Sequence, residues 1–166
     1  MIPVAARIAR TGGDRLAVFR VINSVRGWSA DRTPVQDARW AMDEAVRRFG
    51  PLPIGLVGHS LGGRAALLAG PHPGVRAVVA LNPWVYSSDT VDLSGRRVLI
   101  VHGDQGRVAS PVKSARVAES LRRSTDVEYV TVAGGKHAML RHRGSYERRA
   151  ADFVASALLG DAVHDR

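Results

Sequence analysis

The sequence predicts an α/β fold, with a mostly parallel sheet of about five strands and helices on both faces. Short apolar, β-branched segments alternate with segments of helical period from one end of the chain to the other. The predicted strands are apolar at nearly every position, which is typical of strands that are covered on both faces. They comprise residues 16–22, 54–58, 77–81, 97–102 and 127–132.

Helices are predicted between these strands, because apolar residues recur there at spacings of three and four. The first predicted helix has Pro3 in its first turn, where proline favours the start of a helix. Gly12 and Gly13 follow it, and glycines favour the end of a helix. The predicted helices are residues 2–10, 34–49, 61–69, 111–123 and 146–159. Since no repeat, low-complexity tract or linker interrupts this pattern, residues 1–166 are predicted to form a single domain.

The composition excludes several classes of protein. A chain of 166 residues that is 45% apolar can bury one core of ordinary size. The absence of cysteine excludes a disulfide scaffold, an iron–sulfur cluster and a thiolate zinc site. Basic residues outnumber acidic ones by 24 to 15, but the arginines are scattered singly or in pairs rather than clustered among aromatic residues. We therefore expect no nucleic-acid partner.

The distribution of apolar residues also bears on location. No apolar run approaches the ~20 residues that a membrane-spanning helix requires, so no membrane partner is expected. The N-terminal segment is interrupted by Arg7 and Arg10 and does not have the residue order of a signal peptide. The sequence therefore predicts a cytoplasmic protein.

A strand, a tight turn and a helix meet at residues 58–63, which read Gly-His-Ser-Leu-Gly-Gly. In a nucleophile elbow the central serine adopts a strained backbone conformation, and the flanking glycines leave room for the strand and the helix. We expect side chains at Gly58 and Gly62 to collide with these neighbours. Ser60 is therefore the candidate nucleophile, placed where the helix N-terminus favours a developing negative charge.

A serine needs a base, and His137 is the candidate. It lies in a glycine-containing loop between the last predicted strand and the last predicted helix, from which it can reach the carboxyl end of the sheet. The other histidines lie within the turn, at the end of a strand or in polar surroundings. An inert serine in a glycine-rich turn, with a solvated loop histidine, is the alternative interpretation.

These motifs resemble those of the α/β-hydrolase family. The resemblance rests on the turn at residues 58–63, on the strand that leads into His-Gly-Asp at residues 102–104, and on Gly-Gly-Lys-His at residues 134–137. It implies a serine hydrolase of carboxylic esters or thioesters that forms an acyl-enzyme on Ser60, with His137 as base and the Leu61 N–H group in the oxyanion hole. It implies small-molecule acyl substrates, and no metal or organic cofactor.

The acid of the catalytic triad departs from the family pattern. The family motif reads His-Gly-x-x-Asp, and Gly106 occupies the place of its aspartate. Asp104 is the nearest carboxylate and is the first candidate for orienting His137. Asp89, in the loop after the preceding strand, is the second candidate, and a pair of Ser60 and His137 without an acid is the third possibility.

The N-terminus departs from the family pattern as well. The first strands of the standard fold are absent, and with them the loop that provides a second oxyanion donor. The chain therefore resembles an N-terminally shortened member, in which Met1 corresponds to an internal methionine of a longer ancestor. A sheet edge left exposed in this way would favour a homo-oligomer.

Two tryptophans are expected near the ligand crevice, because they follow predicted strands. Trp28 and Trp84 are candidates for substrate binding, and simple packing over the end of the sheet is the alternative. The departures in the acid and in the oxyanion loop also support a second hypothesis for the whole chain. In that hypothesis it is a catalytically weak or inactive relative that serves as a binding or interaction protein.

Overall fold

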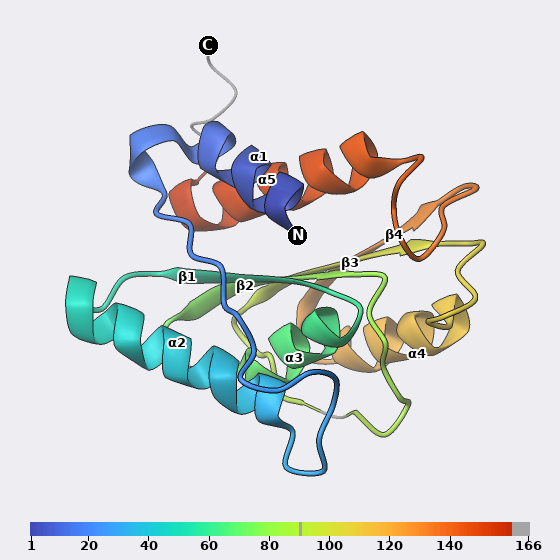
Figure 1. The fold of residues 1–166 in the computed structure, drawn as a ribbon, viewed down its shortest axis with the longest axis horizontal. Helices are drawn as coiled ribbons and strands as arrows, with labels where there is room; N and C mark the ends of the chain where they lie inside the picture. Colours follow the sequence, from blue (N-terminus) through green and yellow to red (C-terminus); the bar gives the residue numbers. More distant parts are fainter. Residues whose placement is uncertain (90, 161–166) are drawn as a thin grey trace.

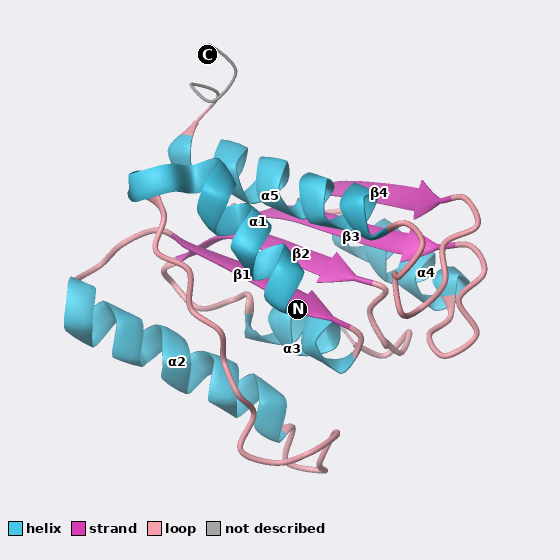
Figure 2. Ribbon diagram, turned by 45° about the horizontal axis from the view of Figure 1, so that its top comes forward, coloured by secondary structure: helices cyan, strands magenta, loops and turns pink. Residues whose placement is uncertain are grey.

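A four-stranded parallel sheet organises the computed structural model, which describes residues 1–89 and 91–160. The strands are β1 (Ile54–His59), β2 (Val75–Leu81), β3 (Arg97–Gly103) and β4 (Asp126–Val132). They lie side by side in chain order, so each strand pairs with the next one in the sequence. All four carboxyl ends therefore open at the same end of the sheet, where the loops can form a site (Figure 2).

Helices cover both faces of the sheet, as the sequence predicts (Figure 1). One face carries α1 (Ile2–Gly12) and α5 (Arg143–Leu159). The other carries α3 (Leu61–Ala69) and α4 (Pro111–Leu121), with α2 (Thr33–Phe49) packed against α3. A short 3-10 turn, η1 (Gly13–Arg15), follows α1.

The hydrophobic core consists of two clusters, one on each face of the sheet. The apolar side chains of β2 and β3 point alternately into both clusters and are almost completely buried, so these two strands form the centre of the protein. β4 instead contains both exposed and partly buried residues, with only Val132 buried. The expectation of strands covered on both faces is therefore confirmed for the two central strands.

The prediction of a fifth strand at residues 16–22 is wrong. This segment is not part of the sheet, and it crosses the edge of the sheet at β1 on its way from η1 to α2 (Figure 1). Leu16 and Val18 pack against the core, whereas Phe19 and Ile22 are 63% and 87% exposed. Aromatic and β-branched residues favour the extended conformation, but a strand also requires a neighbour with which to form its ladder. β1 is consequently an edge strand of the described sheet.

The remaining elements lie where the sequence places them, apart from their ends. The largest difference is in α5, which begins at Arg143 rather than Tyr146, and α4 ends at Leu121 rather than Arg123. Within the described ranges no helix has the length and hydropathy needed to cross a membrane.

Candidate active site

Ser60 occupies a strained turn between β1 and α3. Its φ of 56° and ψ of −120° lie outside the conformations that side-chain-bearing residues favour. Its N–H group donates to the carbonyl of Leu81 at 3.0 Å, and its carbonyl accepts from the N–H groups of Arg64 and Trp84, both at 3.1 Å. These three bonds fix the turn from both sides, so the strain is maintained by the fold around it.

Two glycines permit this turn, and one of them is not the glycine that the sequence indicates. A side chain at Gly58 would overlap the backbone of Gly62. A Cβ atom at Gly63 would lie 3.1 Å from Pro83, whereas one at Gly62 would meet no described atom within 4 Å. The expectation of a collision is thus correct for Gly58 and wrong for Gly62, because α3 turns its second residue toward open space.

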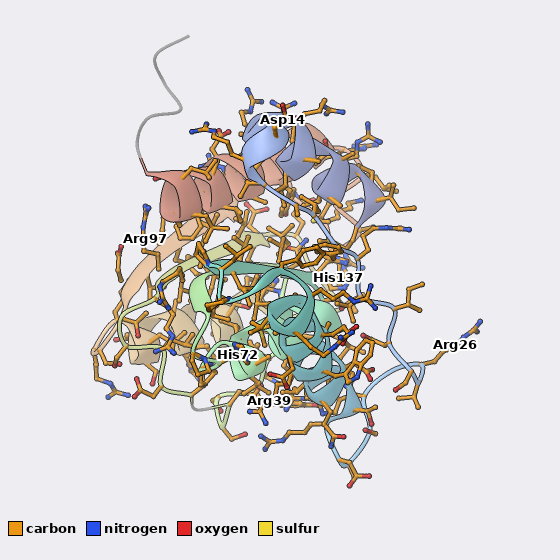
Figure 3. The ribbon with its side chains drawn as sticks, turned by 90° about the vertical axis from the view of Figure 1, so that its left-hand side faces the viewer. Asp14, Arg26, Arg39, His72, Arg97 and His137 are labelled. Carbon is orange, nitrogen blue, oxygen red and sulfur yellow. The ribbon has the colours of Figure 1, made fainter. Side chains whose placement is uncertain are left out.

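His137 reaches Ser60 from the loop between β4 and α5. Its Nε2 atom lies 3.0 Å from the Oγ atom of Ser60, a hydrogen-bond distance between residues 77 positions apart. Figure 3 shows His137 at the level of the sheet, between the two helix layers. The structure therefore brings the candidate nucleophile and the candidate base together.

The electrostatic environment favours an uncharged His137. Burial lowers its pKa, and the neighbouring His59 lowers it further. Burial also lowers the pKa of His59, whose ring centroid lies 4.9 Å from that of His137. A neutral imidazole can accept the proton of a serine hydroxyl, so the protonation state suits a general base.

The expectation that Asp104 orients His137 is wrong in this structure. The Oδ1 atom of Asp104 accepts a hydrogen bond from the N–H group of Gly134 at 2.8 Å. The Nδ1 atom of His137 is buried and has no hydrogen-bond partner within residues 1–89 and 91–160. Asp104 lies on the exposed side of its turn and stabilises the start of the histidine loop instead.

Asp89 is committed to a different partner. Its carboxylate forms two hydrogen bonds of 2.8 Å with the guanidinium group of Arg64, and both side chains are over 90% buried. It also accepts a bond from the N–H group of Tyr86. Of the three possibilities for the acid, the described geometry leaves the pair of Ser60 and His137 without a carboxylate on Nδ1.

Trp28 and Trp84 lie around Arg64. The guanidinium carbon of Arg64 is 4.1 Å from the ring centroid of Trp28, 5.7 Å from that of Trp84 and 4.7 Å from that of Tyr86. These contacts correspond to the packing alternative, in which the rings surround a buried cation. Substrate binding by either tryptophan stays a prediction.

The motifs in the sequence do not predict the role of Arg64 at this site. The only signal was an arginine in the otherwise apolar helix 61–69, four residues after Ser60. Because an arginine is rarely buried without a partner, that position could have indicated an ion pair at the site.

Leu61 is the first residue of α3, so its N–H group has no partner one turn earlier within the helix. This position suits an oxyanion donor next to Ser60. Within the described part of the chain no strand precedes β1, so the described residues do not include the loop implied for the second donor. The described residues also contain no cluster of three histidine or acidic side chains that could hold a metal ion.

The fold and the site together can be compared with known proteins. The sequence matches no protein family model and no curated protein. A serine hydrolase homologue from Coxiella burnetii is similar, with a TM-score of 0.68 and 19% identity over 90% of this chain and 75% of that one. A putative α/β hydrolase of unknown function from Agrobacterium tumefaciens has a TM-score of 0.72 and 18% identity over 95% and 78% of the two chains.

An esterase domain from Rhodothermus marinus is similar as well, with a TM-score of 0.65 and 18% identity over 96% of this chain and 78% of that one. At these identities the likeness establishes the fold. The chain has the α/β-hydrolase fold, with four strands in its described sheet, and covers about three quarters of the length of these relatives.

Proposed function

We propose that the protein is a serine hydrolase of small carboxylic esters or thioesters. The observation that carries the proposal is the distance of 3.0 Å between His137 Nε2 and Ser60 Oγ, in a turn that strains Ser60. The esterase domain and the serine hydrolase homologue among the similar structures support the same class of reaction. The proposed reaction uses side chains and main-chain groups alone.

In the proposed reaction, Ser60 Oγ attacks the carbonyl carbon of the substrate while His137 Nε2 takes its proton. The N–H group of Leu61 donates to the oxyanion of the tetrahedral intermediate. The intermediate collapses to the acyl-enzyme as His137 returns the proton to the leaving alcohol or thiol. Water then attacks the carbonyl carbon of the acyl-enzyme while His137 takes its proton. The second tetrahedral intermediate collapses, His137 returns the proton to Ser60 Oγ, and the carboxylic acid is released.

The unpartnered Nδ1 atom implies a slow enzyme. A carboxylate on Nδ1 holds the imidazole with its free lone pair on Nε2 and stabilises the imidazolium that forms. His137 lacks such a partner among the described residues. Removing the orienting acid from a complete triad costs about 10⁴ in turnover, so we expect turnover well below that of a complete triad.

The experiment combines a fluorophosphonate probe with p-nitrophenyl acetate and a short acyl thioester. The wild type is compared with Ser60→Ala, with His137→Gln and with Ser120→Ala, a control serine on α4 that bonds to Arg123. We expect labelling and hydrolysis in the wild type and the control, none in Ser60→Ala, and slower labelling in His137→Gln. Labelling of Ser60→Ala equal to that of the wild type would contradict the proposal.

A catalytically weak or inactive binding protein is the second candidate. The observation that favours it is that Asp104 bonds to Gly134 while Nδ1 of His137 has no described partner. Absence of both labelling and hydrolysis in the folded wild type would support this candidate. Sedimentation analysis of the same sample would then test whether the edge strand β1 pairs two copies.

A further inference from the structure

The side chain of Asn82 connects the ends of two strands to the histidine loop. It is fully buried at the carboxyl end of β2. Its Nδ2 atom donates to the carbonyls of His137 at 3.0 Å and Lys136 at 3.3 Å. Its Oδ1 atom accepts from the N–H group of Gly103 at 2.8 Å and from the hydroxyl of Tyr146 at 3.3 Å. Both ends of the amide are therefore satisfied in one orientation, because carbonyls need a donor and an N–H group needs an acceptor.

The backbone at Asn82 matches this role. Its φ is 41°, in the left-handed region that asparagine tolerates better than most residues. Its N–H group donates to the carbonyl of Val101 at 2.8 Å, which continues the pairing of β2 with β3. The central strands thus hold Asn82 rigidly, and Asn82 in turn holds the loop.

A second donor reaches the same carbonyl from β1. The Nε2 atom of His59 lies 2.8 Å from the carbonyl oxygen of His137, and because a carbonyl only accepts, His59 carries its proton on Nε2. The carbonyl of His137 therefore receives hydrogen bonds from residues at the ends of two neighbouring strands: β1, which leads into the Ser60 turn, and β2, whose Leu81 carbonyl accepts from the Ser60 N–H group.

We infer that Asn82 and His59 are positioning residues for His137, which they orient through its main-chain carbonyl where other triads use a carboxylate on Nδ1. Two hydrogen bonds to the carbonyl fix the backbone of His137, and hence the direction in which its side chain leaves the loop. The bond to Ser60 and the ring of His59 then restrict the imidazole itself. This inference rests on the proposed function and adds to it Asn82, which lies outside the sequence motifs, and a role for His59 of the turn motif.

A matched pair of variants at His59 isolates the donor. His59→Gln places an amide N–H near the position of the imidazole Nε2–H, whereas His59→Leu has similar bulk and no donor. Both variants remove the second imidazole, so its electrostatic effect on His137 is lost equally in the two. Asn82→Asp keeps the acceptor for Gly103 and removes the donor to His137. His72→Leu is the control, since His72 lies on the loop before β2, away from this end of the sheet.

The measurements are kcat and KM for p-nitrophenyl acetate, and the ring resonances of His137 in protein labelled at histidine with ¹⁵N. We expect kcat to fall by about tenfold to a hundredfold in His59→Leu and Asn82→Asp, with KM within about twofold of the wild type. In His59→Gln and His72→Leu, kcat should stay within about threefold. The His137 resonances should shift or broaden further in His59→Leu than in His59→Gln, which reports the loss of the second imidazole alone, and they should also change in Asn82→Asp.

The two proposals can fail separately. If folded His59→Leu keeps the kcat and the His137 resonances of His59→Gln, and folded Asn82→Asp keeps those of the wild type, the positioning role is overturned. Equal losses in His59→Gln and His59→Leu would overturn the role of the hydrogen bond from His59. If the wild type hydrolyses no ester while the His137 resonances still respond as expected, the proposed function fails and the orientation of His137 by these residues stands.

Discussion

The carboxylate of Asp104 accepts a hydrogen bond from the N–H group of Gly134 at 2.8 Å, three residues before His137. Asp104 therefore supports the loop that carries the histidine and leaves the imidazole Nδ1 atom without a carboxylate. The bond lies on the exposed side of the protein, where one hydrogen bond contributes about 1 kcal/mol. Asp104 of the His-Gly-Asp segment thus has a local structural role.

Replacing Asp104 by asparagine should change little. The amide oxygen of Asp104→Asn can still accept from Gly134, and the lost charge does not contact His137. We expect kcat/KM for p-nitrophenyl acetate to stay within about threefold of the wild type. A fall of about 10⁴, as when a triad loses its acid, would show instead that Asp104 reaches His137 during catalysis.

Installing a carboxylate at Gly106 should raise the activity. The N–H group of Gln105 donates to the carbonyl of Gly135 at 3.0 Å, so the residue before Gly106 contacts the histidine loop. A Cβ atom at Gly106 would be 3.3 Å from the carbonyl of Ala109, a tight contact that a small shift of the loop would relieve. We expect kcat to rise by about tenfold or more in Gly106→Asp, up to the 10⁴ that a triad acid provides.

Gly106→Ala is the control for this gain, since it adds the Cβ atom without the carboxylate. An equal rise in kcat for Gly106→Ala and Gly106→Asp would assign the effect to loop rigidity. No rise in a folded Gly106→Asp variant would show that this position does not reach Nδ1.

The pH dependence of hydrolysis should reflect the lowered pKa of His137. The base acts in its neutral form, so kcat/KM rises with pH through the pKa of the free enzyme. Burial and His59 lower that pKa, and the midpoint of the acid limb should therefore lie below the ordinary value of about 6.5. Rates of p-nitrophenyl acetate hydrolysis across a pH series test this sign, and a midpoint above 6.5 would contradict it.

The His59→Gln variant separates the two causes of this shift. It removes the neighbouring imidazole while His137 stays buried. The midpoint should move upward without returning fully to the ordinary value, because burial is the larger cause. An unchanged midpoint would mean that burial alone lowers the pKa.

Breaking the buried ion pair beside the site should destabilise the fold. Asp89→Asn would leave the guanidinium group of Arg64 buried without a countercharge, although its aromatic neighbours remain. We expect the free energy of unfolding to fall by about 3–5 kcal/mol, measured by urea denaturation. Glu44→Gln is the control, because Glu44 pairs with Arg47 and Arg48 on the surface of α2. A loss in Asp89→Asn no larger than that in Glu44→Gln would contradict the expected destabilisation.

Hydrophobic patterning predicted most of the fold because burial on both faces leaves a direct mark on a sequence. Residues 77–81 and 98–101 are apolar throughout and lie in the two central strands. The same pattern wrongly predicted a strand at residues 16–22, which are largely apolar and include β-branched residues as well. Whether such a segment becomes a strand depends on a neighbouring strand with free ladder groups, and no local pattern encodes that neighbour.

The amino-acid sequence by itself determined the sheet of parallel strands, the glycine-flanked turn at Ser60 and the approach of His137, because loops after parallel strands meet at one end of a sheet. Only the tertiary structure decided the partners of the charged and polar side chains: Asp104 bonds to Gly134, Asp89 to Arg64, and Asn82 to the histidine loop. The reason is physical. Burial follows from the composition of a segment. A hydrogen bond requires donor and acceptor to be placed to within a few tenths of an ångström, and the whole fold sets that placement.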